Sequence, residues 1–433
     1  MSAGPAPHAT SEPARRDGPR QPLLPVADAL ARLLDGVAPL SDVESVPTLT
    51  ARGRVLAVPL QSRIDVPAAD NAQMDGYAVR AADLAGATPG SPVVLPVVQR
   101  IPAGHAAHPL AIGSAARIFT GALMPAGADA VVMQEAVQAD ADAGTVAFAQ
   151  PAAAGAWVRY RGEDIRSGHV ILPAGTRLAP QHLGLAASIG TAEVTVVRRP
   201  RVAIFSTGDE LAMPGEVAVE DLKAGALFNS NRFTLRNLIE ALGCEVVDLG
   251  IVPDTLAATR EALVRAAAQS DCIVTSGGVS VGEEDHIKPA VAAEGSIDFW
   301  QLAIKPGKPL AFGRVRGAGH AALFVGLPGN PVSGFVTFLV CVRPLLMRLQ
   351  GIVDTAPRAW TLRADFAWPK PDARQEYLRV RSNDAGGLDL FPQQGSAVLT
   401  STVWADGLVE NPPGRAIAPG DLVRFLPFAA LIG

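Results

Sequence analysis

The spacing of apolar positions divides the chain into stretches that predict different kinds of element. Residues 61–167 carry short apolar runs between glycine and proline residues, at 92–98, 130–133 and 145–148. Short runs separated by turn residues predict strands, so we expect an all-β unit here. Before it, residues 23–60 begin with a helical pattern and continue as extended chain; after it, 180–189 predicts a helix and 193–197 a strand.

From residue 201 onward, apolar runs of strand length alternate with longer runs of helical pattern. The strand-like runs lie at 202–206, 244–249 and 272–275, and the helical runs at 232–242, 256–268 and 287–293. Strands that helices cover on both faces are apolar throughout, so the alternation predicts a parallel α/β sheet. Extended runs at 299–304, 310–313 and 322–326 follow, before a long helix at 331–349 that Asn330 and Pro331 begin.

After Gly351 the helical pattern ends. Strand-like runs at 360–364, 376–381, 388–391 and 421–425 are separated by proline, glycine and asparagine, which predicts a small antiparallel β module. A chain of 433 residues has room for about three domains. Its 48% of apolar residues can fill several cores and excludes wholesale disorder; residues 1–22, rich in proline, alanine and charge, are expected to form a disordered leader.

Charge, cysteine content and hydropathy exclude several classes of partner and site. Lys plus Arg number 37 and Asp plus Glu 42, a net charge of −5, so we expect no nucleic-acid partner. The three cysteines lie in apolar runs without a Cys-x-x-Cys pattern, which excludes a disulfide framework and a multi-cysteine zinc site and indicates a cytoplasmic protein. The apolar stretch at 335–346 contains Arg343 and Pro344 and is shorter than the roughly 20 residues that span a bilayer, so no membrane partner is expected.

Candidate chemistry lies in the loops that follow the predicted strands. Those at 206–210, 276–285, 305–309 and 327–333 all contain glycine, and among them they carry hydroxyl groups, acids and lysines. In an open parallel sheet, ligands bind beyond the carboxyl ends of the strands, where helix N-termini and backbone N–H groups converge. The loops therefore predict a pocket for a phosphorylated or anionic ligand, with acids able to hold Mg²⁺, which shares its oxygen ligands with phosphates.

Other motifs allow competing interpretations. Gly278-Val279-Ser280-Val281-Gly282 matches the G-x-S-x-G nucleophile elbow of serine hydrolases, although further residues separate Ser280 from the preceding strand. His105 and His108 could bind a metal or could be solvated loop histidines. No P-loop motif and no dinucleotide-binding fingerprint occurs in the sequence, so neither of those nucleotide sites is expected.

Four acidic or hydroxyl residues outside these loops have two readings each. Asp75, Thr120 and Asp164 stand in polar runs of the β-rich stretch, where such residues either make turns or contribute to a site. Asp254 could either start a helix or belong to the site. Residue types alone leave these alternatives open.

Several motifs then occur in a fixed order along the chain: Asn71…Met74-Asp75-Gly76-Tyr77-Ala78, Ile118-Phe119-Thr120-Gly121, Arg161-Gly162-Glu163-Asp164, Ser206-Thr207-Gly208-Asp209-Glu210-Leu211, Thr275-Ser276-Gly277-Gly278-Val279-Ser280-Val281-Gly282, Lys305-Pro306-Gly307-Lys308-Pro309 and Leu327-Pro328-Gly329-Asn330-Pro331-Val332-Ser333. With this series, residues 23–433 resemble the molybdopterin molybdenumtransferases, the family that includes the C-terminal domain of gephyrin. The chain departs from the family at Ala72-Gln73, where Ser-Ala is usual.

The resemblance implies a multidomain α/β plus β fold. We expect a discontinuous, extended linker domain at 23–60 and 168–198, a β-rich inserted domain at 61–167, a parallel α/β molybdopterin-binding domain at 199–350, and a small C-terminal β-barrel at 355–433. It further implies an elongated homodimer, in which the α/β domain of one subunit and the β-rich domain of the other share the active site.

The implied reaction inserts molybdate, a substrate, into adenylylated molybdopterin and releases AMP. The implied catalytic acids are Asp75, Asp164, Glu210 and Asp285, and the implied Mg²⁺ ligands are Asp209, Glu210 and Asp285. The adenylylating enzyme of the pathway is the expected protein partner. The residues expected to bind substrate or oxyanion are Thr120, Ser206, Thr207, Gly208, Gly277, Gly278, Ser280, Lys305, Lys308, Pro328, Asn330, Ser333, Arg379 and Ser396.

These roles agree with the chemistry of the residue types. Both substrates are anions, and Lys305 and Lys308 can present two ammonium groups from either side of a Pro-Gly turn. The alternatives are a molybdopterin adenylyltransferase, which would lack the β-rich and C-terminal modules, and a non-enzymatic dimeric scaffold, which would have no need of the acids.

Overall fold

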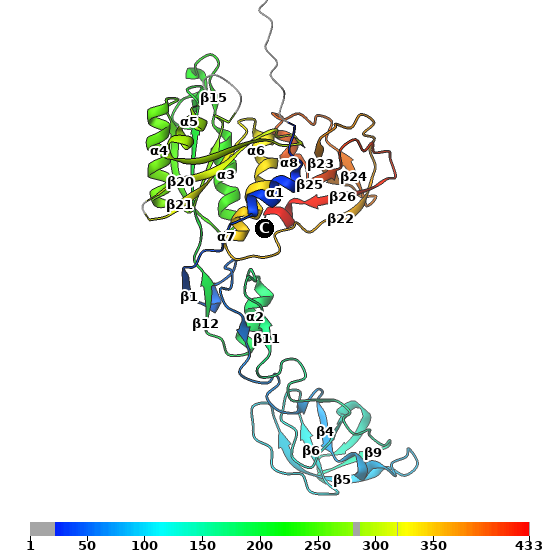
Figure 1. Ribbon diagram of the computed structural model, residues 1–433. Coiled ribbons are helices and arrows are strands. Elements are labelled where there is room, and N and C mark those ends of the chain that lie inside the picture. Colours follow the sequence, from blue (N-terminus) through cyan, green and yellow to red (C-terminus); the bar gives the residue numbers. More distant parts are fainter. Residues whose placement is uncertain (1–21, 280–285, 318, 433) are drawn as a thin grey trace, which may run out of the picture. The chain divides into compact units, whose positions relative to one another are not determined.

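The computed structural model describes residues 22–279, 286–317 and 319–432 (Figure 1). The chain forms two compact units: unit 1 contains the residues up to Leu40 and those from Arg198 onward, and unit 2 contains Ser41–Val197. The predicted leader lies outside the described residues except for its last position. Each unit has its own hydrophobic clusters and is described by itself.

The α/β part of unit 1 is built on a six-stranded sheet in the order β16-β13-β17-β21-β20-β18. Strands β16, β13, β17 and β21 are mutually parallel, whereas β20 runs antiparallel to both β21 and β18. The strands are β13 (Arg201–Thr207), β16 (Glu245–Val252), β17 (Cys272–Ser276), β18 (Gly295–Gln301), β20 (Pro309–Arg316) and β21 (Ala321–Leu327). The predicted parallel sheet is confirmed; the run at 322–326 forms the parallel strand β21, and β20 and β18 extend the sheet with antiparallel pairings.

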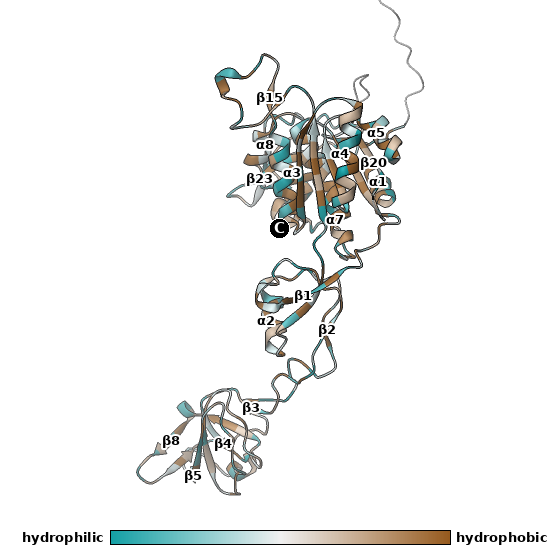
Figure 2. Cartoon of the chain, turned by 90° about the vertical axis from the view of Figure 1, so that its left-hand side faces the viewer, coloured by the Kyte–Doolittle hydropathy of each residue, from teal (hydrophilic) through white to brown (hydrophobic). Residues whose placement is uncertain are grey.

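Helices cover both faces of this sheet, which explains why its strands are apolar throughout (Figure 2). On β13, Val202 and Ile204 belong to one hydrophobic cluster, and Ala203 and Phe205 belong to the other. The first cluster includes residues of α3 (Ser230–Ala241), and the second includes residues of α4 (Leu256–Gln269) and α5 (Ile287–Glu294). Two short strands, β14 (Leu211–Ala212) and β15 (Leu227–Phe228), pair beside α3, with the 3-10 turn η4 (Val219–Asp221) between them in sequence.

The predicted helix at 331–349 contains a change of helical type. It consists of α6 (Pro331–Thr337), a π-helical turn (Phe338–Val342) and α7 (Arg343–Leu349). Pro344 has no N–H to donate within the helix, and the π turn lies directly before it. The segment is long and apolar enough to cross a membrane, with a mean hydropathy of 1.6, yet 89% of it is buried inside the protein. It is therefore a core helix of unit 1.

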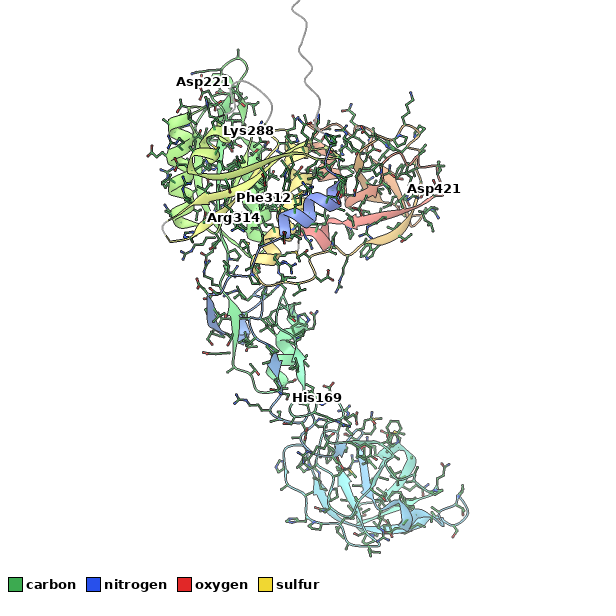
Figure 3. The ribbon with its side chains drawn as sticks, in the orientation of Figure 1. His169, Asp221, Lys288, Phe312, Arg314 and Asp421 are labelled. Atoms are coloured by element: carbon green, nitrogen blue, oxygen red, sulfur yellow. The ribbon has the colours of Figure 1, made fainter. Side chains whose placement is uncertain are left out.

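Residues 23–40, expected in the linker domain, lie in unit 1. Helix α1 (Val26–Leu34) packs against α7 and buries Val26, Ala29 and Leu33 in the core. Leu24 N–H donates to Gln301 O at 2.8 Å. On β20, Phe312 packs against the same core, and the Arg314 guanidinium donates to Gly36 O at 3.3 Å (Figure 3). The helical pattern of residues 26–34 shows that one face is apolar, but it does not show which surface covers that face. The domain boundary expected from the sequence therefore differs from the boundary between the two units after Leu40.

The C-terminal part of unit 1 is a closed β-barrel, as expected. Its strands follow the order β23-β24-β22-β26-β25, and an additional β23–β25 pairing closes the ring. The β22–β24 pair is parallel, unlike the antiparallel module that the sequence predicted. The elements are β22 (Trp360–Ala364), β23 (Gln375–Ser382), β24 (Gly387–Leu390), α8 (Thr400–Trp404), β25 (Gly407–Asn411), β26 (Leu422–Pro427) and α9 (Phe428–Ile432).

One strand joins the barrel to the α/β part. Strand β19 (Ile304–Lys305) pairs in parallel with β23, so that Lys305 lies opposite Glu376. Because β19 follows β18 and precedes the loop to β20, the barrel is attached beside a loop that the sequence singles out for chemistry.

Unit 2 contains the β-rich part and the linker part. The β-rich part has a six-stranded sheet in the order β7-β4-β6-β5-β9-β8, antiparallel except for the β5–β6 pair. Its elements are β3 (Asn71–Ala72), β4 (Gly76–Val79), η2 (Ala81–Leu84), β5 (Val93–Ile101), β6 (Ala115–Ile118), β7 (Ala130–Met133), η3 (Gln134–Ala136), β8 (Val137–Asp140), β9 (Thr145–Phe148) and β10 (Val158–Arg159).

The linker part is assembled from two separate stretches of sequence. Strand β1 (Val43–Pro47) pairs with β12 (Glu193–Val197), and β2 (Leu60–Gln61) pairs with β11 (Val170–Leu172). The 3-10 turn η1 (Thr48–Thr50) and helix α2 (Pro180–Ser188) complete it. Leu56, Leu172 and Val196 share one small core, which is why the two stretches form a single module.

Replacement of Leu33 by alanine tests the placement of α1. Leu33 is fully buried, so Leu33→Ala should lower the free energy of unfolding of unit 1 by about 2–5 kcal/mol. Leu422→Ala, at an exposed position of the barrel, is the matched control and should change it by about 0.5 kcal/mol or less. Chemical denaturation of both variants measures the difference, and equal effects would contradict the placement.

Candidate functional site

A cavity of about 820 Å³ opens where β13, β17 and β21 end in unit 1. This volume lies within the usual range for small-molecule sites, and the carboxyl edge of a parallel sheet is the expected location for one. The predicted loops meet here. The predicted residues that line the cavity are Ser206, Thr207, Glu210, Gly277, Gly278, Lys305, Lys308, Pro328, Asn330, Ser333 and Ser396.

Glycine determines the shape of two of the loops. Gly278 follows β17 with a φ of +65°, and a Cβ added there would lie 2.6 Å from Ile287 Cγ1. Gly307 has a φ of +106°, and a Cβ there would clash with the Thr337 hydroxyl. Side chains are disfavoured at both positions, so the backbone of each loop can come close to a ligand.

The two lysines of the 305–309 loop differ in their electrostatic surroundings. Lys305 Nζ lies 3.1 Å from Glu376 Oε1 and 3.3 Å from Asp372 Oδ2. Glu376 is fully buried and also accepts a hydrogen bond from Trp368 Nε1 at 2.7 Å. Lys308 is exposed and forms no ion pair with any residue that the structure describes. Lys308 is therefore the more available cation of the two.

A further cation, Arg374, lines the cavity but is already paired. Its Nε and NH2 atoms donate to the two oxygens of Asp372 at 2.9 and 2.8 Å. These hydrogen bonds hold the pKa of the Asp372 carboxyl far below its usual value, and Lys305 adds to the effect. Asp372 thus stays ionised and neutralises much of the charge on this side.

Arg379 does not line the cavity, so its role as an oxyanion contact stays a prediction. Its side chain is 1% exposed and donates to Ser401 Oγ, Tyr377 O and Gly395 O at 3.2, 3.0 and 3.3 Å. Burial lowers the pKa of the guanidinium to about 10, so the group is still charged at neutral pH. Because Gly395 does line the cavity, Arg379 supports the wall through this hydrogen bond.

The acids at the end of β13 are also separated by the structure. Glu210 is the one acid among the described residues that line the cavity. Its carboxylate lies over Gly208, which together with Asp209 is outside the lining. Asp209 Oδ1 accepts the Asp254 N–H at 3.3 Å. The cap of α4 is Thr255, so Asp254 does not itself begin the helix.

Within the described residues, no group of three His, Cys, Asp or Glu side chains could hold a metal. The expected residues Asp285 and Ser280 lie outside the described residues. Glu210 alone still fits a magnesium site, because Mg²⁺ often takes only one or two carboxylates and completes its shell with phosphate and water. His105 and His108 gain no partners for metal binding: His105 Nδ1 contacts Ala103 O, and the His108 N–H donates to Gln99.

Two of the three expected residues of unit 2 are directly bonded. Asp75 Oδ1 accepts the Thr120 N–H at 2.8 Å and the Thr120 hydroxyl at 2.7 Å. These two hydrogen bonds lower the pKa of Asp75, and the bond from the Thr120 N–H has the larger effect. The nearby positive charge of Arg117 also lowers it. Arg117 is held over the Phe119 ring at 4.5 Å and donates to Gly76 O at 2.8 Å. Asp164 is exposed, and its N–H donates to Val66 O instead.

The sequence analysis missed several residues that line the cavity. Asn229, Ser230 and Asn231 come from the start of α3, and Arg374 and Gln394 come from the C-terminal part of unit 1. Asn231 Nδ2 donates to Ser276 Oγ and to Gly329 O, both at 2.7 Å. The available signal was the polar Asn-Ser-Asn run before the helix at 232–242, since helix N-termini meet at this edge of such a sheet.

Comparison with known proteins covers every part of the fold. Residues 24–190 match the MoeA N-terminal region (domain I and II), 203–348 match a probable molybdopterin binding domain, and 361–428 match the MoeA C-terminal region (domain IV). The molybdopterin molybdenumtransferase of Haemophilus influenzae is 37% identical over 418 residues, which are 95% of this chain and 100% of that protein. That of a Nostoc species is 38% identical over 428 residues, or 98% and 92%.

The fold is also that of solved structures. The molybdopterin biosynthesis moeA protein from Pyrococcus horikoshii matches with a TM-score of 0.82 and 29% identity, over 94% of this chain and 100% of that chain. A second structure from that organism matches with a TM-score of 0.75 and 32% identity, over 94% and 99% of the two chains.

Replacement of Thr120 by valine tests the bonding of Asp75. Thr120→Val keeps the N–H and the shape but removes the hydroxyl donor, so the pKa of Asp75 should rise toward its ordinary value. A carboxyl with a depressed folded-state pKa stabilises the fold above its unfolded pKa, and the gain is lost as pH falls through the folded value. In the variant the gain should therefore be smaller, and its loss should be complete at a higher pH. Carboxyl ¹³C NMR titration measures the pKa of Asp75, and Thr50→Val is the control that should leave this pKa as in the wild type. The same Asp75 pKa in Thr120→Val and Thr50→Val would contradict the predicted role of the hydroxyl.

Proposed function

This chain belongs to the molybdopterin molybdenumtransferase family, and on that premise we propose that it inserts molybdate into adenylylated molybdopterin with release of AMP. The general activity, transfer of molybdenum to molybdopterin in molybdenum cofactor biosynthesis, is the one that its relatives' names carry. The observation that carries the finer reaction is the cavity of unit 1, where lysines, glycine turns and Glu210 together line a space at the carboxyl edge of a parallel sheet.

The side chains of the cavity suit two anionic reactants. Lys308 has no counter-ion among the described residues, so an incoming oxyanion can take that place. Lys305, already held by Glu376 and Asp372, adds a fixed positive charge whose orientation is set in advance. Ser333 and Ser396 also line the cavity, and their hydroxyl groups can donate to further oxygen atoms.

No protein thiol is required for this reaction, because the dithiolene sulfurs of molybdopterin are the ligands of the metal. Cys244, Cys272 and Cys341 are all buried, and none lines the cavity as described. Burial raises the pKa of Cys341 to about 12 and that of Cys272 still higher, so both remain protonated thiols.

Glu210 would hold the magnesium ion that the family resemblance implies, with Asp285 as a second implied ligand. When bound, Mg²⁺ would offset the negative charge of the phosphates near Glu210. The residues of the chain would meanwhile bind and orient the reactants on either side of the scissile bond to AMP.

We further propose a homodimer in which residues of unit 2 complete the cavity of the partner copy. The resemblance supports this arrangement through Asp75, Thr120 and Asp164, and the bonded Asp75–Thr120 pair would bring an ionised carboxylate to the site. The adenylylating enzyme of the pathway is the proposed supplier of substrate. A cytoplasmic location agrees with the free cysteines.

Loss of AMP release in Glu210→Gln tests the reaction. This substitution removes the one described acid of the cavity without changing its size, so release of AMP from adenylylated molybdopterin in the presence of molybdate should be abolished. Glu216→Gln, exposed and outside the lining, is the control and should keep full turnover. Chromatography measures the AMP released. Full turnover by Glu210→Gln would contradict the catalytic role assigned to Glu210. ATP consumption with molybdopterin would instead indicate an adenylyltransferase.

Mixing Glu210→Gln with Asp75→Asn tests the shared site. If each site needs both residues from different copies, exchange of subunits produces one intact site in each mixed dimer. Random mixing of the two inactive proteins should then restore about a quarter of the wild-type rate of AMP release. No recovery after demonstrated subunit exchange would contradict the shared site while leaving the reaction itself intact.

Comparison of Lys308→Ala with Lys305→Ala tests the oxyanion contacts. Loss of Lys308 should weaken molybdate binding by about 10-fold or more, with little effect on the melting temperature. Loss of Lys305 should weaken binding and also lower the melting temperature, because the buried Glu376 loses its cation. Isothermal titration and calorimetric melting separate these results, with Lys370→Ala as the exposed control. Unchanged molybdate affinity in Lys308→Ala would move the oxyanion site elsewhere.

A further inference from the structure

Asn229 has an unused donor in the wall of the cavity. Its side chain is 2% exposed, and Oδ1 accepts the Arg232 N–H at 3.1 Å as the cap of α3. Nδ2 has no hydrogen-bond acceptor among the described residues. An amide flip would place Nδ2 against the Arg232 N–H and lose the cap, so the orientation is determined.

A buried donor without a partner is unfavourable in the ligand-free protein. Desolvation of such a group costs free energy that a hydrogen bond normally offsets. Because Asn229 lines the cavity, a ligand atom that accepts a hydrogen bond would remove the cost. The cap through Oδ1 fixes the rotamer of Asn229 before the ligand arrives, so less side-chain entropy is lost on binding.

The surroundings of Asn229 favour an anionic acceptor. Helix α3 has 12 residues, and its first turn has no acidic residue. The first N–H groups of a helix have no carbonyl partner within the helix, and its N-terminus carries a partial positive charge. Ser230 and Asn231 of this turn line the cavity beside Asn229. Arg232 is turned to Asp248, with Nε 2.9 Å from Oδ2, and does not compete for the ligand.

The same cavity therefore has two places that attract anions. One is formed by Lys308 on the 305–309 loop, and the other by the start of α3, which follows β15. Two such places suit a reaction that brings an oxyanion to a phosphorylated substrate. The lysine side offers full charges, which suit the dianion molybdate, whereas the helix side offers neutral directed donors, which suit a phosphate that is already esterified.

We propose that Asn229 Nδ2 and the first turn of α3 bind a phosphate oxygen of the adenylylated substrate, and that the same contact holds the phosphate of the product AMP. The inference rests on the proposed function, because it takes the nucleotide as the ligand. It assigns to α3 a role in binding that is separate from the oxyanion contacts of Lys305 and Lys308.

AMP and adenosine share the base and differ in the phosphate, so comparing their affinities distinguishes a contact to the phosphate from a contact to the base. The variants are Asn229→Asp, which keeps the capping oxygen but replaces the donor by a charge, and Asn229→Ser, which keeps a capping oxygen without charge or amide. Asn237→Asp places the same new charge at an exposed position of the same helix and is the matched control. Isothermal titration of the full-length proteins is done in magnesium chloride, because the Glu210 carboxylate lines the same cavity and opposes an unscreened phosphate.

The wild type and Asn237→Asp should bind AMP more tightly than adenosine. Asn229→Ser should lose about 10-fold in AMP affinity and Asn229→Asp more, while adenosine affinity and melting temperature stay close to wild type. Two results would overturn the phosphate contact but not the proposed function. In the first, Asn229→Ser and Asn229→Asp bind AMP as tightly as Asn237→Asp does. In the second, their affinity for adenosine falls as much as their affinity for AMP. A wild-type protein that binds no AMP would overturn the proposed function together with this contact.

Discussion

The buried carboxylate of Glu376 is the point on which the geometry of the cavity depends. Its oxygens accept from Lys305 Nζ, Trp368 Nε1 and Asn411 Nδ2, so that one group joins the 305–309 loop to the barrel. A carboxylate with no exposed surface is tolerated only where its charge and its lone pairs are satisfied. The barrel therefore keeps its register against the loop, as the β19–β23 pairing also requires.

This junction makes the C-terminal barrel a part of the site. Arg379 of β23 is buried and donates a hydrogen bond to Gly395 O. The next residue, Ser396, lines the cavity. The N–H of Val332, in the first turn of α6, donates to Ser396 O at 3.0 Å, which ties this wall to the helix that follows β21. Two loops of the α/β part and one of the barrel are thus held by hydrogen bonds that no ligand has to form.

The sequence analysis succeeded where chemistry follows from local pattern. Glycines at 277, 278 and 307 after apolar runs indicate tight turns at strand ends, and the cavity forms there. A sequence says less about a side chain that can serve either a ligand or the fold. Arg379 and Lys305 are both basic residues in recognisable motifs, yet Arg379 is buried outside the cavity lining and Lys305 is paired with Asp372 and Glu376. A sequence shows that a side chain is basic, but it does not show which acidic residue pairs with it in the folded protein.

By itself, the sequence predicted the classes of element and the parallel α/β sheet from period and turn residues, which are local properties of the chain. The family, and with it the barrel, followed from the ordered motifs. Only the tertiary structure decided that α1 packs on the α/β core, that Asp209 accepts a hydrogen bond from the backbone of Asp254, and that Asn229 in the lining of the cavity has a buried amide donor without an acceptor among the described residues. Each of these depends on contacts between residues far apart in sequence or on the geometry of a cap. Burial and the identity of a partner arise from packing, which the order of residue types does not contain.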